Sequence, residues 1–407
     1  MTTETGETPY AGSAPSTKNA VLCRYSEIFL KGGNRGFFEH KLAANIRRAT
    51  SRLGGRVERL HGRILYWPPP GGESRALAAL QKVFGLVSLS AVRIVEKDIK
   101  LIGDAAVEEV GIALEQQPGW RPRFKVDTRR SDKRFQPSSP LASAEVGGRI
   151  IDAHGLGVDL HTPELVVGVE IGFEHAFVYA RVLPGPGGLP VGSSGEVDLL
   201  LSGGIDSPVA GWMAMKRGCH IAATYFHSFP YTGDKTKDKV ARLASRIASW
   251  QGEVELRVVP FTDAQKALRD AGDPRLAVVL YRRMMMRVAE RIARSRGALA
   301  LVTGEALAQV ASQTLENMTV IEEACGLPIL RPLIAHDKQE TITVARRIDT
   351  FELSIEPYED CCSLFAPDHP ATKARLADVL EAESKVDIAA LVEACIAGVE
   401  IIRCKTG

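Results

Sequence analysis

The sequence predicts a two-part protein, in which an α+β N-terminal half precedes an α/β domain with a doubly wound parallel sheet. Three features of the 407 residues predict this: a linker-like segment near the middle, hairpin signals before it, and apolar strands that alternate with helices after it. A chain of this length forms two or three domains of ordinary size. Its 45% hydrophobic and 25% charged residues are typical of a globular protein and exclude collagen, coiled coil and wholesale disorder.

Two stretches are not expected to form regular elements, and no membrane span is expected. Residues 183–195 contain ten Gly, Pro or Ser among thirteen positions, which indicates a linker. Residues 1–19 are rich in Thr, Gly, Pro and Ser and lack the apolar core of a secretory signal, so we expect a disordered tail. No run of about 20 apolar residues is present, so we expect no membrane span.

The N-terminal half predicts two α+β units. The first has a strand at 20–30, a helix at 35–53, a hairpin at 57–67, a helix at 74–84 and a strand at 87–95. This β-α-β-β-α-β order is typical of a ferredoxin-like domain. A second unit of two helices and three strands follows and extends to residue 182.

The C-terminal half has the pattern of a parallel sheet. Apolar strands are predicted at 197–201, 221–226, 254–259 and 298–303, with helices between them. Strands that are buried on both faces have such continuous apolar runs, and alternation of strands with helices produces a doubly wound sheet.

The first of these strands leads into Ser-Gly-Gly-Ile-Asp-Ser, at the place where an open α/β sheet binds ligands. Gly203 and Gly204 allow a tight turn that exposes backbone N–H groups, and Ser202 and Ser207 add hydroxyl donors. A carboxylate repels a bare phosphate, so we expect Asp206 to act through Mg²⁺ bound to a polyphosphate. The simpler alternative is a Gly-Gly turn with Asp206 as a helix cap.

This loop resembles the PP-loop of ATP pyrophosphatases, and further segments resemble the ThiI-type tRNA sulfurtransferases, the 4-thiouridine synthetases. The segments that carry this resemblance lie at 24–34, 124–133, 226–232, 282–286, 303–313, 330–334 and 359–365. The resemblance implies a tail at 1–19, a ferredoxin-like domain at 20–85, a THUMP RNA-binding domain at 86–184, a linker at 185–196 and a PP-loop domain at 197–407.

The resemblance also implies a reaction with ATP and Mg²⁺ as cofactors. ATP would adenylate O4 of the uridine at position 8 of tRNA, and sulfur from a persulfide would then replace that oxygen to give 4-thiouridine. The implied ATP-binding residues are Leu200, Leu201, Ser202, Gly203, Gly204, Ser207, Tyr225, Phe226, Arg282, Gly304 and Gln313. Without the resemblance, Tyr225 and Phe226 would be equally well explained as strand core.

Cys361 and Cys362 are the candidate sulfur-handling residues. Proline residues on both sides favour a loop, and adjacent thiols can accept and resolve a persulfide. We favour Cys361 slightly as the acceptor. The chain ends at Gly407, which leaves no room for the C-terminal rhodanese domain of some family members, so we expect sulfur to be held on another cysteine or to arrive on another protein. The five other cysteines are expected to be packing residues.

A basic segment at 123–134 is the candidate tRNA-binding surface. Its net charge of +4 contrasts with +2 for the whole chain, and phosphate contacts would explain this concentration. A solvated charged loop is the alternative. The basic residues are Arg123, Lys125, Arg129, Arg130, Lys133 and Arg134.

The sequence therefore predicts an enzyme of tRNA modification in the cytoplasm. A cysteine desulfurase is implied as sulfur donor, a sulfur-carrier protein of thiamine thiazole synthesis as a second partner, and a homodimer as the assembly. Two alternatives remain: another PP-loop enzyme of the 2-thiolation or lysidine type, and a non-catalytic RNA-binding protein. Only seven cysteines and no C-x-x-C motif favour a reducing compartment.

Overall fold

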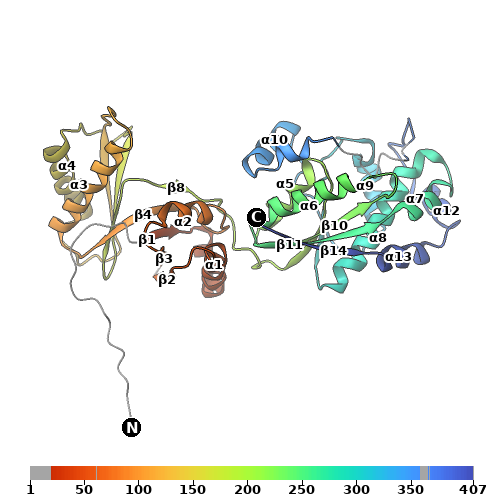
Figure 1. Ribbon diagram of the computed structural model, residues 1–407, viewed down its shortest axis with the longest axis horizontal. Coiled ribbons are helices and arrows are strands. Elements are labelled where there is room, and N and C mark those ends of the chain that lie inside the picture. The colour runs from red at the N-terminus through yellow and green to blue at the C-terminus, as the bar shows by residue number, and fades with distance from the viewer. Residues whose placement is uncertain (1–19, 61, 358–364, 366, 407) are drawn as a thin grey trace, which may run out of the picture. The chain divides into compact units, whose positions relative to one another are not determined.

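The computed structural model describes residues 20–60, 62–357, 365 and 367–406 (Figure 1). This part of the chain divides into two compact units. The first contains residues 20–24, 50–81 and 88–184, and the second contains residues 25–49, 82–87 and the residues from 185 onward. None of the helices within these ranges is long and apolar enough to cross a membrane.

The first unit contains one mixed sheet with the strand order β2-β3-β1-β4-β7-β6-β5. β5 and β6 pair in parallel, whereas the other neighbours on this path pair antiparallel. The strands are β1 (Ala20–Arg24), β2 (Arg56–Leu60), β3 (Arg63–Trp67), β4 (Ser88–Val95), β5 (Phe124–Arg130), β6 (Leu165–Ile171) and β7 (Ala176–Tyr179), and β8 (Leu183–Pro184) pairs with β4.

Helices α2 (Glu73–Leu80), α3 (Ile99–Glu115) and α4 (Ser139–His154) belong to this unit. α3 begins at Asp98, whose carboxylate accepts the backbone N–H groups of Lys100 and Leu101. The apolar sides of α3 and α4 pack on one face of β5–β7 and form a buried cluster with Val167 and Val169 at its centre. These elements agree with the predicted α+β pattern.

The strand predicted at 20–30 is shorter than expected. β1 ends at Arg24, and the 3-10 helix η1 (Glu27–Asn34) follows and leads into α1 (Arg35–Ala49). Gly32 has φ 51°, a left-handed conformation that an extended strand cannot contain. The apolar residues of 28–30 therefore belong to a helical turn.

The second unit contains a six-stranded sheet with the order β13-β12-β9-β10-β11-β14. The first five strands run parallel, and β14 adds an antiparallel edge. β9 leads to β10 and β11 on one side and to β12 and β13 on the other, which is the doubly wound topology predicted. The strands are β9 (Glu196–Leu200), β10 (His220–His227), β11 (Glu253–Pro260), β12 (Ala300–Val302), β13 (Ile329–Leu330) and β14 (Glu400–Lys405).

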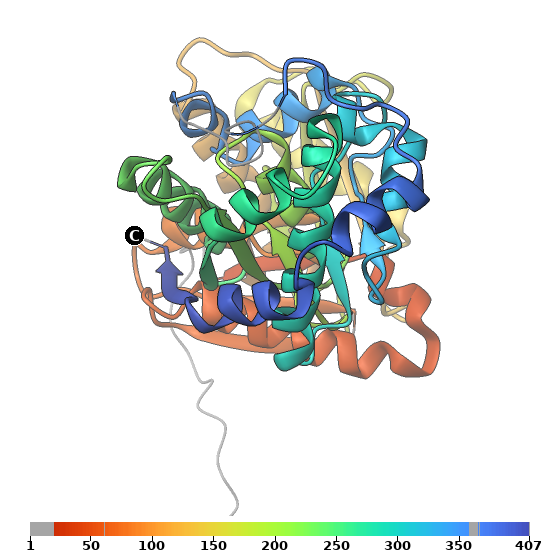
Figure 2. The ribbon, with the colours of Figure 1, turned by 90° about the vertical axis from the view of Figure 1, so that its right-hand side faces the viewer.

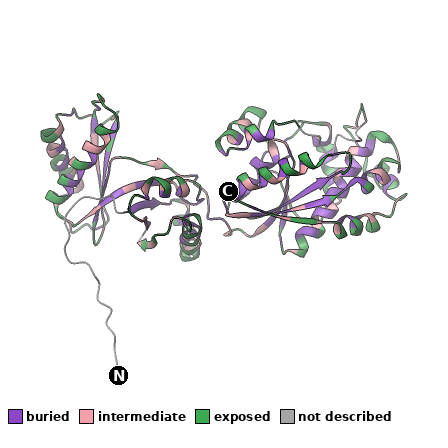
Figure 3. Cartoon of the chain, in the orientation of Figure 1, coloured by how far each residue is buried: buried purple, intermediate pink, exposed green. Residues whose placement is uncertain are grey.

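Helices cover both faces of this sheet (Figures 1 and 2). Neighbouring residues of β9 face opposite sides: Leu199 belongs to the core under α5 and α6, and Leu200 packs against the core under α8. Figure 3 shows the buried residues concentrated in the strands and on the inner sides of the helices. The helices are α5 (Asp206–Lys216), α6 (Asp234–Ala248), α7 (Thr262–Arg269), α8 (Ala277–Ser295), α9 (Leu315–Glu322), α10 (Lys338–Arg347), α11 (Phe351–Ser354), α12 (Leu376–Glu383) and α13 (Ile388–Ala397).

Candidate functional site

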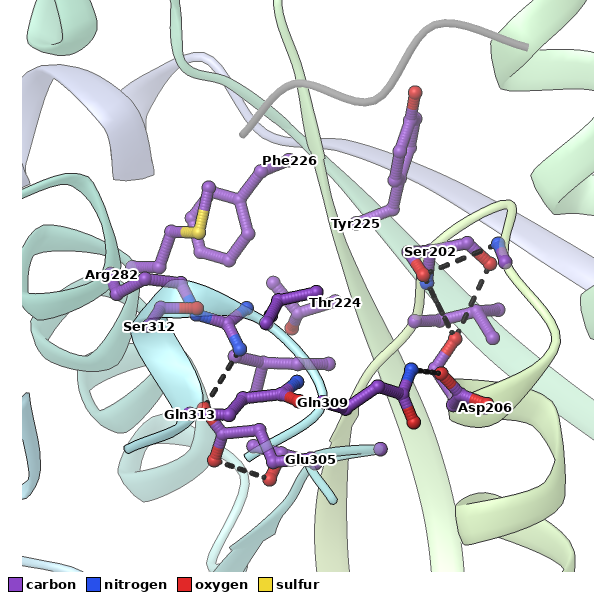
Figure 4. Close-up of a pocket in the computed structure, with 18 residues that line it drawn as sticks. Ser202, Asp206, Thr224, Tyr225, Phe226, Arg282, Glu305, Gln309, Ser312 and Gln313 are labelled. Atoms are coloured by element: carbon purple, nitrogen blue, oxygen red, sulfur yellow. Dashed lines mark hydrogen bonds and ion pairs between the residues drawn. The ribbon is translucent and has the colours of Figure 1, made fainter. Parts of the chain in front are cut away.

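A cavity of about 250 Å³ lies at the carboxyl ends of β9, β10 and β12 (Figure 4). The chain turns to opposite sides of the sheet at this point, which is where doubly wound folds bind ligands. Ten of the eleven residues predicted to bind ATP line the cavity, and Gly203 is the exception. Their role in binding stays a prediction. Asp206, Thr224, Met285, Thr303, Glu305, Gln309, Val310 and Ser312 complete the lining.

The loop between β9 and α5 forms one end of the cavity. Ser207 Oγ accepts the backbone N–H of Ser202 at 2.9 Å and lies 3.2 Å from Ser202 Oγ, so the two hydroxyls close the loop. Gly304 approaches this loop so closely that a Cβ at this position would lie 2.7 Å from the Ser207 nitrogen. Any side chain at position 304 would push the loop away from β12.

Asp206 is bonded on both carboxylate oxygens. Lys338 Nζ donates to Oδ1 at 2.7 Å. Gln309 Nε2 donates to Oδ2 at 2.9 Å, a bond that Figure 4 shows. Lys338 is the first residue of α10, whose start is fixed by a capping box between Asp337 and Glu340. Neither Lys338 nor Gln309 was predicted from the sequence. A lysine at the start of a helix could have indicated a functional role, because the helix dipole disfavours a cation there.

Glu305 forms a second charged cluster at the cavity. Its Oε1 accepts Arg282 Nη2 at 2.8 Å, and its Oε2 accepts Arg331 Nε at 2.9 Å and Thr303 Oγ1 at 3.0 Å. Burial raises the pKa of Glu305, but the charges of Arg282 and Arg331 overcome this effect, so the pKa lies below its usual value. The carboxylate therefore stays ionised and fixes the Arg282 guanidinium at the cavity wall.

The end of the cavity opposite the loop is lined by apolar and amide side chains. Phe226 packs edge-on against Phe261, with ring centroids 5.0 Å apart, and Met285 and Arg282 come from α8. Gln313 Oε1 is buried and has no hydrogen-bond partner among the described residues, so this amide can bond a bound group. Figure 4 shows Ser202 and Asp206 at one end, Phe226 and Arg282 at the other, and Gln309 between them.

The basic segment of the first unit lies on β5 and the loop after it. Arg129 is exposed and paired with Asp127 at 2.9 Å, and Arg134 is paired with Asp132 at 3.1 Å. Arg130 instead donates to Ser139 Oγ at 3.2 Å and to the carbonyl oxygens of residues 135 and 137. Arg130 thus holds the loop in place, while the exposed cations are Arg123, Arg129, Lys133 and Arg134.

Cys361 and Cys362 lie outside the described residues. Cys23, Cys219, Cys395 and Cys404 are buried, in agreement with the predicted packing role. Burial raises the pKa of Cys23 to about 12 and that of Cys395 to about 11, which makes both thiols unreactive. No group of three or more His, Cys, Asp or Glu suited to a metal ion occurs in the described part of the chain.

The fold and site define a class of protein: an α/β domain with a Ser-Gly-Gly loop at the carboxyl ends of its strands, preceded by an α+β unit with a basic strand and loop. Three family models match the chain: the ThiI ferredoxin-like domain at residues 20–90, the THUMP domain at 96–181, and the thiamine biosynthesis protein ThiI at 192–388. A probable tRNA sulfurtransferase from Moorella thermoacetica is 47% identical over 385 residues, which is 94% of this chain and 97% of that protein. One from Brevibacillus brevis is 44% identical over 392 residues, or 94% and 96% of the two chains.

Two solved structures are also similar over most of the chain. A 4-thiouridine synthetase in complex with RNA and bound ATP has a TM-score of 0.87 and 35% identity, covering 95% of this chain and all of that one. PH1313 from Pyrococcus horikoshii has a TM-score of 0.66 and 25% identity, covering 81% and 99%. The chain belongs to the ThiI family of tRNA sulfurtransferases, which confirms the predicted family and fold class.

Proposed function

We propose that this protein adenylates O4 of the uridine at position 8 of tRNA with ATP and replaces that oxygen with sulfur to give 4-thiouridine. The observation that carries this proposal is a cavity lined by the Ser202–Ser207 loop and by the fixed Arg282, with Lys338 bonded to Asp206 of its lining. The similar 4-thiouridine synthetase solved with RNA and ATP supports it.

ATP fits the cavity by its chemistry. The backbone N–H groups at the start of α5, with the positive end of its dipole, suit the phosphates. Lys338 carries a positive charge at the same place and would contact them when it leaves Asp206. Tyr225 and Phe226 at the end of β10 would flank adenine, and the Gln313 amide offers it a hydrogen bond.

The site also fits Mg²⁺ through Asp206. Mg²⁺ bound with a nucleotide takes one or two protein carboxylates and completes its coordination with phosphate oxygens and water. The Lys338 ammonium on Asp206 Oδ1 shows that this oxygen is accessible to a cation. When bound, the ion would supply charge neutralisation for the departing pyrophosphate.

The remaining steps use the activated base. A carbonyl oxygen is a poor leaving group, whereas AMP leaves readily, so adenylation prepares C4 for attack by sulfur. A persulfide on Cys361 or Cys362, loaded by a cysteine desulfurase, would attack C4 and expel AMP. The neighbouring thiol would then break the S–S bond, leaving sulfur on the base and a disulfide that a cellular thiol must reduce.

Phe365 supports a location of this chemistry near the cavity. Its ring lies 5.1 Å from that of Tyr231, in the loop that follows β10, and β10 supplies Tyr225 and Phe226 to the cavity. Phe365, three residues after Cys362, therefore contacts the loop that follows β10.

The same proposal assigns tRNA to the first unit. Arg123, Lys125, Arg129, Lys133 and Arg134 would contact phosphates, with Arg130 shaping the loop that presents them. We also propose the domain limits 20–85, 86–184 and 197–407, and a homodimer as the assembly. A second role, with a sulfur-carrier protein in thiamine thiazole synthesis, is part of the same proposal. A tRNA substrate and unpaired cysteines favour the cytoplasm.

The test is incubation of purified protein with unmodified tRNA, ATP, Mg²⁺, cysteine and a cysteine desulfurase, followed by mass spectrometry of the nucleosides. We expect 4-thiouridine at position 8 and one pyrophosphate per modified base. A 2-thiolated base or lysidine would establish the other PP-loop chemistries, and neither pyrophosphate nor product would indicate a non-catalytic RNA-binding protein.

A further inference from the structure

The loop that follows β10 presents two exposed aromatic side chains. Phe229 is 60% exposed and Tyr231 is 44% exposed. They follow the carboxyl end of β10, the strand that contributes Thr224, Tyr225 and Phe226 to the cavity. Tyr231 also packs against Phe365, with ring centroids 5.1 Å apart, so Phe229 presents the freer ring, and an exposed ring at the edge of a site suits a binding surface.

This loop is held firmly by hydrogen bonds. The Ser228 backbone N–H donates to Thr232 Oγ1 at 3.0 Å, and the Thr232 N–H donates to the Ser228 carbonyl at 2.9 Å. From α7, Thr262 Oγ1 donates to the Phe229 carbonyl at 2.7 Å. Ser228 and Thr232 are fully buried. The two rings are thus presented by a preorganised backbone, which lowers the entropic cost of binding.

A row of rings connects the cavity to this surface. The ring centroid of Tyr225 lies 5.8 Å from that of His227, which lies 6.2 Å from that of Phe229. His227 is only 7% exposed, and its Nε2 has no hydrogen-bond partner among the described residues. A buried ring nitrogen without a partner is costly, and a bound polar group at this position would satisfy it.

A cation lies beside the rings. Lys266 Nζ, on α7, is 5.3 Å from the centroid of the Tyr231 ring. Aromatic faces that stack bases, combined with a cation that pairs with phosphate, are the elements with which proteins bind unpaired nucleotides. The surface of a protein partner would reach the buried Nε2 of His227 less easily than the polar groups of a single nucleotide would.

We infer that His227, Phe229, Tyr231 and Lys266 form the surface that holds the target pyrimidine nucleotide of the RNA after it leaves its stack, next to Tyr225 at the cavity. This inference rests on the proposed function, because chemistry at C4 requires the base outside the stacked RNA. Phe229 stacks on the base or its neighbour, His227 Nε2 bonds the nucleotide, and Lys266 pairs with its phosphate. The rings from Phe229 through His227 to Tyr225 extend from this surface to the cavity, so a base bound here lies next to it.

The kinetic test uses Phe229→Ala, with Leu299→Ala as the matched control. Leu299 is exposed to a similar extent, but it precedes β12 and therefore lies at the amino ends of the strands, whereas the loop after β10 lies at their carboxyl ends. We expect kcat/KM for tRNA to fall about tenfold in Phe229→Ala, the loss typical of one stacked base, with ATP affinity and melting temperature unchanged. His227→Phe keeps the ring and removes the nitrogen, and should show the same pattern.

A crosslinking test locates the base directly. Near-ultraviolet light couples 4-thiouridine to side chains that touch it, so wild-type protein bound to tRNA carrying this base should yield a crosslinked peptide that includes Phe229 or Tyr231. Crosslinks confined to other peptides would overturn the inference, as would variants that match Leu299→Ala. If wild-type protein makes no 4-thiouridine, the proposed function itself fails, which is a separate result.

Discussion

Lys338 and Asp206 are 132 residues apart in sequence, yet Lys338 Nζ lies 2.7 Å from Asp206 Oδ1. Each is the first residue of its helix, α10 and α5. The N-termini of both helices therefore approach one point, where their dipoles add to the positive charge of Lys338. Asp206 balances this charge, and under the proposed function its carboxylate would also bind the metal ion beside the polyphosphate.

Substitution of Asp206 tests this arrangement. Asp206→Ala should abolish pyrophosphate release, because Mg²⁺ would lose the protein carboxylate proposed to bind it. Affinity for tRNA, measured by filter binding, should stay within about twofold, since the predicted phosphate contacts lie in the first unit. Pyrophosphate release at the wild-type rate would contradict the metal role.

Glu305→Gln should weaken ATP binding more than tenfold. All three partners of this carboxylate donate hydrogen bonds, so the amide nitrogen of Gln would face a donor, and both Arg282 and Arg331 would lose the buried charge that neutralises them at the cavity. The measurement is calorimetric titration with ATP. Glu322→Gln is the control, because Glu322 also pairs with Arg331 but is half exposed, and it should bind ATP as the wild type does.

Ala308→Gly should raise the free energy of unfolding by up to about 1 kcal/mol. Ala308 has φ 61°, a left-handed conformation that costs a residue with a Cβ about 1 kcal/mol, and this strain outweighs the extra freedom of glycine in the unfolded chain. Its N–H donates to the Gln313 carbonyl at 2.8 Å, so the turn cannot relax easily. Denaturant titration provides the measurement.

Ala44→Gly is the matched control for that experiment. Ala44 is exposed in the interior of α1, where glycine should destabilise the protein by about 1 kcal/mol. Equal losses at both positions would show that the turn at Ala308 is not strained.

The sequence predicted the site best where the residues of the site are neighbours along the chain. The loop from Ser202 to Ser207 could be predicted because its glycines, hydroxyls and position after an apolar strand are contiguous. Gln309 could not be predicted, because its role depends on a contact across 103 residues with Asp206. Similarly, the apolar residues after Arg24 suited a strand, whereas the chain forms η1 there, with a kink at Gly32, where φ is 51°.

The two neighbouring arginines of β5 should behave differently. Arg129→Ala should lower the slope of log K against log salt for tRNA by about 0.7–0.9, because it removes one of the proposed phosphate contacts. The melting temperature should not change, because the ion pair of Arg129 with Asp127 is exposed. Arg130→Ala should lower the melting temperature, since its guanidinium holds the loop at Ser139 and Pro137. If Arg129→Ala leaves the slope unchanged, the segment is only a solvated charged strand and loop.

The last prediction concerns sulfur. Cys361→Ser and Cys362→Ser should still release pyrophosphate in the presence of tRNA, because the ATP chemistry is assigned to the cavity at Asp206. At least one variant should fail to form 4-thiouridine with a cysteine desulfurase, since a serine hydroxyl can neither hold a persulfide nor reduce one. Free sulfide should restore product, because sulfide can attack the adenylated base directly. The measurement is 4-thiouridine formation with each sulfur source, and Cys325→Ser, at a half-buried thiol, is the control. If both variants match this control with the desulfurase, the pair does not carry sulfur, and another cysteine or a separate carrier protein must deliver it.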